Sequence, residues 1–457
     1  YKRQSLRQGA NDFVQDYADF RASEAGGNHS VQIIDITELY NQFAFGINPH
    51  PISIRNFINF AIDKWEIQPN HVLLLGKAVT YADITYNSTN FSGNLVPTYG
   101  HTPSDNMLAC RHANTYQPQV AIGRVPAEFP QQVQAYLEKL TQYTASYVGT
   151  DCAENNFWRK HFLQLTQSDS EEESANVTAN FAAYEATLSG AGLGGKSLGL
   201  YQNNFVAALP NSNIGQAIVD GAGWIIYTGS SNNNGYWNTD VASPLAYDNA
   251  GKYPFVLSNA NISGQIHQVP NVSECIASDY VLANQSGAIA FLANSGEFFE
   301  ETANAYTTAF IENVTQQNYG ESLGFCVAKN IENLYDETEN ETPNLTKYIL
   351  QTKTLVGDPA IHIVPRPKVE LTFLSNDNIT FYNPNTGFEI ISDPIYVSSE
   401  MPHFETELVL HNAGRAVQDS IFFAAQRLLQ NGSLSTVIRK RIAIPFYSDT
   451  IRLNVPN

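Results

Sequence analysis

The chain is 457 residues long, more than one compact core holds, and this length predicts about two to four domains. Apolar residues make up 43% of the chain and charged residues 15%, which is too apolar for a disordered protein. The 44 acidic residues outnumber the 25 basic ones, and the net charge of −19 disfavours nucleic acid and anionic membrane surfaces as partners. The longest apolar runs fall far short of the roughly 20 residues that a membrane-spanning helix needs, so no membrane span is expected.

Residues 1–152 alternate between apolar strands and amphipathic helices, which indicates an α/β layered unit. The run His71–Leu75 is apolar throughout and ends at Gly76, a pattern typical of a buried parallel strand. The expected elements in chain order are a strand at Val31–Ile36, a helix at Pro51–Trp65, strands at His71–Leu75 and Gln119–Ile122, and a helix at Gln131–Tyr143.

The same alternation starts again in residues 153–366 and predicts a second α/β unit. The helix expected at Glu171–Leu188 opens with acidic residues, which the helix macrodipole favours. Strands are expected at Phe162–Leu165, Leu198–Tyr201, Gly223–Thr228, Pro254–Asn259, Ala288–Ala293 and Ile361–Val364, with a helix at Tyr306–Val314.

Residues 367–457 contain short apolar runs separated by turn signals and no helical pattern, which predicts a β-sandwich. The six expected strands are Val369–Phe373, Pro394–Val397, Glu405–Leu410, Ser420–Leu428, Val437–Ile444 and Thr450–Leu453. Since the chain begins within an expected helix and ends within this β unit, we expect it to be an excised, truncated segment of a longer protein.

Two polar loops follow strands of the second α/β unit and are the sequence's candidate site. In open α/β sheets, ligands bind beyond the carboxyl ends of the strands. Gly229–Trp237 follows the strand 223–228, and Asn259–Gly264 follows the strand 254–259. Both are rich in small polar residues that leave backbone N–H groups open to a ligand, although this pattern alone is weak evidence for a pocket.

The composition gives little support for a metal or another cofactor. The cysteines Cys110, Cys152, Cys275 and Cys326 are widely spaced and form no CxxC pair, which argues against a zinc site. Structural calcium has no supporting motif, because the acidic run Asp169–Glu173 lacks the interleaved glycine and spacing of an EF-hand loop. We therefore expect no cofactor.

Short motifs recur in a fixed order over residues 1–365: Leu39-Tyr40-Asn41-Gln42-Phe43, Leu73-Leu74-Leu75-Gly76, Val96-Pro97-Thr98-Tyr99-Gly100 with Ser104-Asp105-Asn106, Ile122-Gly123-Arg124-Val125-Pro126-Ala127, Ser286-Gly287-Ala288-Ile289-Ala290 and Gly357-Asp358-Pro359-Ala360. As a set they resemble the gingipain family of cysteine peptidases. The resemblance implies a caspase-like α/β fold in two subdomains with parallel sheets, followed by an immunoglobulin-like domain. It also implies a secreted or surface protein of the Bacteroidota, exported by the type IX system.

At the catalytic loops the resemblance breaks down. The family has a histidine in a Gly-His-Gly-Ser-like loop and a cysteine in a later Ser-x-x-Cys-x-x-Gly-like loop. This chain has Gly229-Ser230-Ser231 in the first loop, so Ser230 stands where the histidine is expected. In the second loop, Ser258-Asn259-Ala260-Asn261-Ile262-Ser263-Gly264, the nucleophile's position is occupied by Asn261. Because the mechanism needs a thiolate activated by an imidazole, the sequence predicts that no intact catalytic pair remains.

Other residues are candidates for lining the former cleft: His101, Asp105, Gly229, Trp237, Ser258 and His267. Asp105 matches the Ser-Asp of the family and is expected either to line the cleft or to fix a loop. Cys275 is expected to be a small packing residue near the start of a helix.

These features lead to two main functional hypotheses and a weaker third one. The first is a pseudopeptidase at the cell exterior, with a protein or peptide partner that includes secretion-system or surface-complex components. The alternative is an active cysteine peptidase of the gingipain family whose catalytic residues have moved; a carbohydrate-binding surface protein is a weaker third reading. The expected domains are residues 1–152 and 153–366 as gingipain-like subdomains and residues 367–457 as the immunoglobulin-like sandwich.

Overall fold

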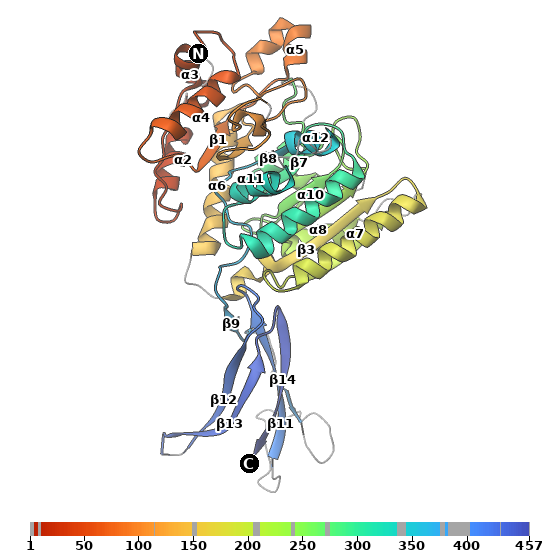
Figure 1. The fold of residues 1–457 in the computed structure, drawn as a ribbon. Helices are drawn as coiled ribbons and strands as arrows, with labels where there is room; N and C mark the ends of the chain where they lie inside the picture. Colours follow the sequence, from red (N-terminus) through yellow and green to blue (C-terminus); the bar gives the residue numbers. More distant parts are fainter. Residues whose placement is uncertain are drawn as a thin grey trace.

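The protein consists of a large α/β body from which a β unit extends at one end (Figure 1). The structure, a computed structural model, describes residues 4–7, 11–113, 115–148, 153–203, 211–238, 243–269, 275–335, 344–374, 380–382, 403–429 and 431–456. No helix in these ranges is both long enough and apolar enough to cross a membrane.

An eight-stranded sheet forms the centre of the body. β7 and β8 pair antiparallel, and all other neighbours in the sheet are parallel. In spatial order the strands are β1 (His71–Leu75), β2 (Ala121–Val125), β8 (Lys353–Val356), β7 (Ala290–Asn294), β6 (Phe255–Asn259), β5 (Trp224–Gly229), β3 (His161–Gln167) and β4 (Lys196–Asn203). The expected large parallel sheet is thus confirmed, and it is continuous because β8 pairs with β2 on one side and with β7 on the other.

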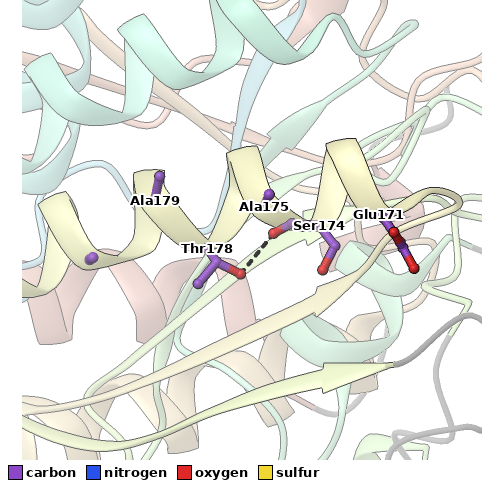
Figure 2. A pocket seen from close by; sticks show the side chains of 6 residues that line it. Glu171, Ser174, Ala175, Thr178 and Ala179 are labelled. Carbon is purple, nitrogen blue, oxygen red and sulfur yellow. Dashed lines mark hydrogen bonds between the residues drawn. The ribbon is translucent and has the colours of Figure 1, made fainter.

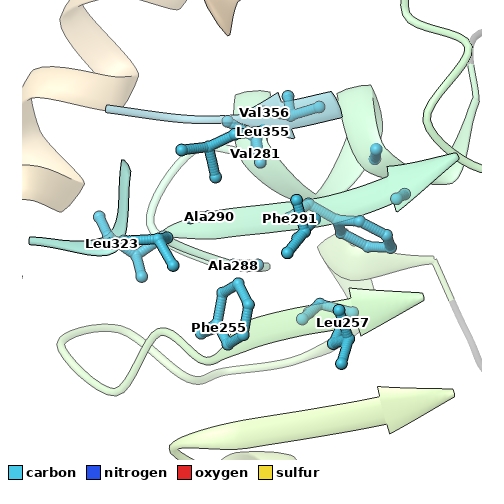
Figure 3. Close-up of a cluster of buried hydrophobic side chains, with 14 of the residues drawn as sticks. Phe255, Leu257, Val281, Ala288, Ala290, Phe291, Leu323, Leu355 and Val356 are labelled. Carbon is cyan, nitrogen blue, oxygen red and sulfur yellow. The ribbon is translucent and has the colours of Figure 1, made fainter. Parts of the chain in front are cut away.

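The middle strands are buried because both of their faces are covered. β2, β5, β6 and β7 are buried along their whole length, as expected for parallel strands packed between helices. Figure 3 shows the core around β6, β7 and β8, where Phe255, Phe291 and Leu355 are among the buried side chains.

Helices cover this sheet, and α7, α10 and α11 lie next to one another in Figure 1. The start of α7 is stabilised by Ser170, whose hydroxyl accepts a hydrogen bond from the Glu173 N–H at 3.1 Å. The helices are α1 (Gln4–Arg7), α2 (Phe13–Ala22), α3 (Ile36–Phe43), α4 (Ile52–Lys64), α5 (Tyr81–Tyr86), α6 (Pro130–Val148), α7 (Glu171–Ser189), α8 (Asn211–Gly221), α9 (Ile276–Leu282), α10 (Glu300–Glu312), α11 (Leu323–Leu334) and α12 (Asn344–Thr352).

Two expected strands of the body are wrong. Val31–Ile36 is an irregular segment that leads into α3, because the Asp35 carboxylate accepts a hydrogen bond from the Thr37 N–H at 2.8 Å and begins a helix there. Ile361–Val364 is also irregular, and the strand that completes the sheet is β8, earlier in the chain. Both segments hold buried apolar residues, so apolar character alone did not separate a strand from a packed loop.

The C-terminal strands form two antiparallel sheets, consistent with the expected β-sandwich. The first contains β9 (Leu371–Thr372), β10 (Thr380–Tyr382), β11 (His403–Asn412) and β14 (Ser448–Pro456), and the second β12 (Ser420–Leu428) and β13 (Leu434–Ala443). Leu410 and Ile451 of the first sheet share a small core with Phe423 and Ile438 of the second. The strand expected at Pro394–Val397 lies outside the described residues.

A buried lysine joins the β unit to the body. Lys160 is fully buried at the end of a short 3-10 helix, Ala153–Lys160, directly before β3. Its ammonium group donates to three carbonyl oxygens of the β unit, those of Asn412 at 2.8 Å, Gly414 at 3.0 Å and Phe446 at 2.7 Å. One side chain therefore satisfies three backbone acceptors at a place where water is excluded.

We predict that Lys160→Met lowers the free energy of unfolding by about 2–4 kcal/mol, because three buried carbonyl groups lose their donor. Thermal and chemical unfolding would measure this loss. Lys196→Met is the matched control, since Lys196 is exposed and its removal leaves no buried carbonyl without a donor. Equal stability of the two variants would contradict the role assigned to Lys160.

Candidate functional site

The two polar loops lie side by side because β5 and β6 are adjacent parallel strands. Their register pairs Trp224 with Phe255 and Thr228 with Asn259, so both strands end at the same edge of the sheet. The loops contact each other directly, since the Ser231 hydroxyl donates to the Asn261 carbonyl oxygen at 2.7 Å. The positions expected from the family's histidine and cysteine, Ser230 and Asn261, are thus brought together by the strand pairing.

Ser230 is partly exposed and has only neutral partners. Its hydroxyl donates to the Gln167 side-chain oxygen and accepts from the Asn238 side-chain nitrogen at 3.0 Å. The Tyr227 hydroxyl donates to the Ser230 carbonyl oxygen at 2.6 Å. An amide oxygen does not remove a proton from a hydroxyl at neutral pH, so Ser230 is not activated as a nucleophile in this arrangement.

Asn261 is exposed, and its side chain holds the next loop in place. Its side-chain oxygen accepts a hydrogen bond from the Phe298 N–H at 2.6 Å, directly after β7. The carboxamide therefore ties the loop after β6 to the loop after β7. This is a positioning contact rather than one that prepares the side chain for chemistry.

Below the loops, two of the expected cleft residues are buried. Trp237 stacks on Tyr227 with ring centroids 4.4 Å apart, and its indole N–H donates to the Ser258 hydroxyl at 2.9 Å. Ser258 also shares a hydrogen bond with the Ser263 hydroxyl at 2.9 Å. The expectation that Trp237 and Ser258 line an open cleft is corrected here: both are core residues that support the loops.

Gly229 is also buried, at the point where β5 passes into its loop. A Cβ atom at this position would lie 2.2 Å from the Gln167 carbonyl oxygen. The glycine lets β3 and β5 stay close together at their ends, so it shapes the backbone rather than presenting a group to a ligand.

Sequence analysis did not identify Lys353, which lies in the centre of this region. It is fully buried at the start of β8, and its amine donates to the Ser258 carbonyl oxygen at 3.0 Å and to the Asn259 side-chain oxygen at 2.9 Å. Burial lowers the pKa of Lys353 to about 7. Gln167 and Asn238 were missed as well; the expected strand at 162–165 pointed only to the neighbourhood of Gln167.

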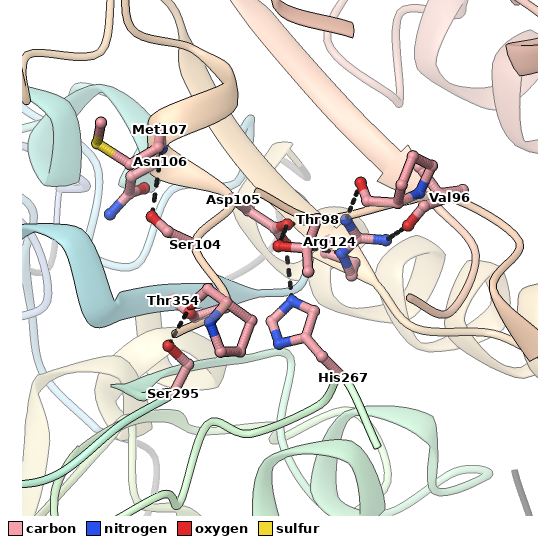
Figure 4. A network of polar contacts seen from close by, with 12 residues as sticks. Val96, Thr98, Ser104, Asp105, Asn106, Met107, Arg124, His267, Ser295 and Thr354 are labelled. Carbon is pink, nitrogen blue, oxygen red and sulfur yellow. Dashed lines mark hydrogen bonds and ion pairs between the residues drawn. The ribbon is translucent and has the colours of Figure 1, made fainter. Parts of the chain in front are cut away.

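Asp105 and His267 belong to a separate, fully buried network (Figure 4). Both Asp105 carboxylate oxygens accept from the Arg124 guanidinium, at 2.7 and 2.8 Å. Thr98 donates to the same carboxylate at 2.9 Å, and His267 Nε2 lies 3.5 Å from it. The expectation that Asp105 and His267 line a cleft is therefore corrected, and the loop-fixing reading of Asp105 describes its contacts.

Burial and the neighbouring Arg124 determine the protonation states of Asp105 and His267. Burial alone would raise the pKa of Asp105, but the Arg124 guanidinium more than offsets this and holds the pKa well below its usual range. Burial lowers the pKa of His267, and the nearby carboxylate only partly opposes that shift. Asp105 is thus ionised and His267 neutral at physiological pH. His101, the remaining candidate, is exposed on the turn between Tyr99 and Ser104.

The described cysteines are poor nucleophiles. Cys110, Cys275 and Cys326 are buried and form no disulfide with one another, and burial raises the pKa of Cys110 and of Cys326 to about 12. Cys152 lies outside the described residues. In the part of the chain that the structure describes, no group of three or more His, Cys, Asp or Glu side chains could hold a metal ion.

Two surface depressions lie along α7. One of about 520 Å³ follows the outer side of α7 and is lined by Glu171, Ser174, Thr178 and three alanines (Figure 2). A second of about 370 Å³ lies between α7 and α10. Neither includes Ser230 or Asn261.

Comparison with known proteins identifies the family. A family model described as peptidase family C25 matches residues 7–364, and the chain therefore belongs to this family. The sequence-based resemblance to the gingipains is confirmed. No curated protein matches the sequence.

Solved structures support the fold over nearly the whole chain. The complex of the RgpB pro- and mature domains from Porphyromonas gingivalis has a TM-score of 0.59 at 14% identity and covers 97% of this chain and 96% of that one. The Arg-specific cysteine proteinase gingipain R (RgpB) also has a TM-score of 0.59, at 15% identity, and the match covers 88% of this chain and 93% of that chain. At these identities the likeness shows the fold alone.

We predict that Asp105→Asn destabilises the protein by about 3–5 kcal/mol at neutral pH, because it leaves the buried Arg124 without its counter-charge. The unfolded chain takes up a proton at Asp105 near pH 4, whereas the folded protein does not. The contribution of Asp105 is therefore present above about pH 4 and declines as the pH falls toward its lower folded pKa. The variant should lack this part of the acid dependence of the unfolding free energy.

The exposed pair of Asp63 and Arg111 is the matched control. It has the same two-pronged geometry, with both N–O distances at 2.8 Å, but water surrounds it. Asp63→Asn should leave stability nearly unchanged. If Asp105→Asn is as mild as Asp63→Asn, the buried network does not have the structural role assigned to it.

Proposed function

We propose that this chain is a catalytically inactive member of peptidase family C25 that acts outside the cell as a binding or structural component. The observation that carries the proposal is that Ser230 and Asn261 lie in the two neighbouring loops that follow the paired strands β5 and β6, loops that are joined by the hydrogen bond from Ser231 to the Asn261 carbonyl oxygen. The family resemblance implies an imidazole and a thiol at these two positions. Both residues here are neutral and hydrogen-bonded to neutral groups, so cysteine-peptidase chemistry has no nucleophile and no base there.

Relocated catalytic residues gain no support from the described part of the chain. The three described cysteines are buried, and His267 is enclosed with Asp105 in the protein interior. A thiol whose pKa is about 12 is almost entirely protonated at neutral pH. The active-peptidase alternative is therefore an outcome of the experiment below and not a second proposal.

The binding role rests on what the loops present once catalysis is absent. Binding and bond cleavage depend on different groups, so a peptide-binding surface can persist without the catalytic pair. Ser231, Asn232 and Asn261 offer hydroxyl and amide groups without net charge, which suits the backbone of a peptide or protein partner. In this proposal the partner is a protein or peptide at the outer cell surface, including components of the type IX secretion system or of a surface complex.

We predict that the wild-type protein does not cleave a diverse fluorogenic peptide library and that the double variant Ser230→His/Asn261→Cys does. The variant restores a base and a thiol on loops that already touch. The gain should be a thiol-reagent-sensitive activity of modest size, because Gln167, Asn238 and Phe298 now bind the replaced side chains. The single variants Ser230→His and Asn261→Cys are the controls, and each should stay far below the double variant.

Turnover by the wild type would overturn the proposal. The first residues to replace would then be His267 and Cys275, by His267→Ala and Cys275→Ala; Cys275 directly precedes α9, which packs on β7. Unfolding curves of all variants would separate loss of the fold from lack of chemistry.

A further inference from the structure

The β12–β13 hairpin concentrates positive charge in a strongly acidic protein. Residues 420–443 contain Arg427, Arg439, Lys440 and Arg441 and neither Asp nor Glu, in a chain whose net charge is −19. Among the described residues, no carboxylate forms an ion pair with Arg439, Lys440 or Arg441. These cations are not needed to neutralise neighbouring acids, so their charge remains available to a partner.

The hairpin has one inner and one outer face, as the period of two in a strand requires. The inner residues Ile421, Phe423, Ile438 and Ile442 pack on the small core of the β unit. On the outer face, Phe422 is opposite Arg441, and Leu428 is opposite Leu434. Alternating exposure along β12 agrees with this division, since residues 422, 424, 426 and 428 are exposed and 421, 423 and 425 are half-buried.

Large apolar side chains are exposed to solvent on this outer face. Phe422 is 66% exposed, Leu428 70% and Leu434 61%, and Leu429 in the turn is 41% exposed. Arg439 lies over the Phe422 ring, with 4.9 Å from its guanidinium carbon to the ring centroid. The face therefore combines leucines near the turn with arginines and an aromatic ring farther along the strands.

The position of the hairpin keeps it apart from the acidic body. In Figure 1, β12 and β13 run away from the α/β body, and their turn lies apart from the other labelled elements. Electrostatic interactions between exposed charges decay over about 8 Å at physiological ionic strength. A flat anionic surface that touches the hairpin thus interacts with the hairpin's cations and hardly with the acidic body. The negative net charge of the whole chain, which disfavours anionic partners, therefore has little effect at this place.

The geometry points to the outer face of the β12–β13 hairpin as a docking surface for an anionic lipid surface. Exposed leucines at a turn insert into the boundary between headgroups and acyl chains, and arginines beside them bind lipid phosphates. An acidic protein would also attract the arginines, but it gives no reason for the leucines exposed near the turn of the hairpin. This inference does not depend on the proposed loss of peptidase activity.

The test is the binding of the full chain to sedimented vesicles of phosphatidylcholine, with and without an equal part of phosphatidylglycerol. We expect binding only to the anionic vesicles and less of it as salt is added. Arg439→Gln/Arg441→Gln should weaken the partition coefficient about 25-fold, at about fivefold for each cation. Leu428→Ser/Leu434→Ser should weaken it by about tenfold or more, because two apolar side chains no longer leave water.

Matched controls come from the body of the same protein. Lys64→Gln/Lys329→Gln changes the net charge equally, and Ile67→Ser/Leu245→Ser removes two side chains that are 72% and 73% exposed. Both controls should bind as the wild type does. In addition, Leu434→Trp should show a blue-shifted emission with anionic vesicles only, which reports insertion of the turn directly.

Three results would overturn the inference. The first is equal binding to both kinds of vesicle, or none to either. The second is hairpin variants that bind as the body controls do. The third is salt-sensitive self-association that Arg439→Gln/Arg441→Gln abolishes, without any vesicle binding; this would assign the face to an acidic protein surface, that of a second copy.

Discussion

Buried cations that bind backbone carbonyl groups hold the irregular segments of this protein to its sheet. Arg124, Lys139, Lys160 and Lys353 are all fully buried, and each donates to backbone carbonyl oxygens of other segments. A loop that crosses a covered sheet carries carbonyl groups that water cannot reach, and each of these needs a donor. A single long cation supplies two or three donors at once, which explains why so few charged residues suffice in so apolar a chain.

These cations differ in how their charge is balanced. Arg124 is paired with Asp105, so its network contains a complete ion pair. Lys139, by contrast, donates to the carbonyl oxygens of Tyr280, Ser286 and Ala288. Burial lowers the pKa of Lys139 and of Lys353. The charged form of these two lysines is therefore disfavoured, and replacing either of them would leave buried carbonyl acceptors without a donor.

The structural networks and the two polar loops after β5 and β6 are built largely from different residues. The networks around Arg124, Lys160 and Lys353 are built largely from residues outside the two loops, whereas Ser230 and Asn261 lie in the loops, and their side chains contact neutral groups among the described residues. A change from histidine or cysteine to a neutral residue in these loops removes no buried charge and opens no cavity in the core. The proposed loss of catalysis is therefore compatible with an intact fold.

Much of the fold was predictable because the spacing of apolar residues and the continuous apolar runs are local signals in the sequence. The strands His71–Leu75 and Ser420–Leu428 were predicted with the boundaries that the structure has, and the β5 and β6 strands within one residue at their ends. Failures occurred where an apolar stretch packs without regular hydrogen bonds, as at Ile361–Val364. The antiparallel pairing of β8 with β7 could not be predicted, because strand order is set by contacts between distant segments.

For the candidate site, too, some features could be predicted from the sequence and others could not. The sequence by itself predicted that Ser230 and Asn261 stand where the family's histidine and cysteine are expected, since identity and spacing along the chain are sequence properties. Only the tertiary structure decided that Asp105, His267, Trp237 and Ser258 are buried and that Lys353 contacts Ser258. Burial depends on which segments pack over a residue, and those segments are up to hundreds of positions away in the chain. A polar side chain has the same letter in a sequence whether it faces water or a buried carbonyl group.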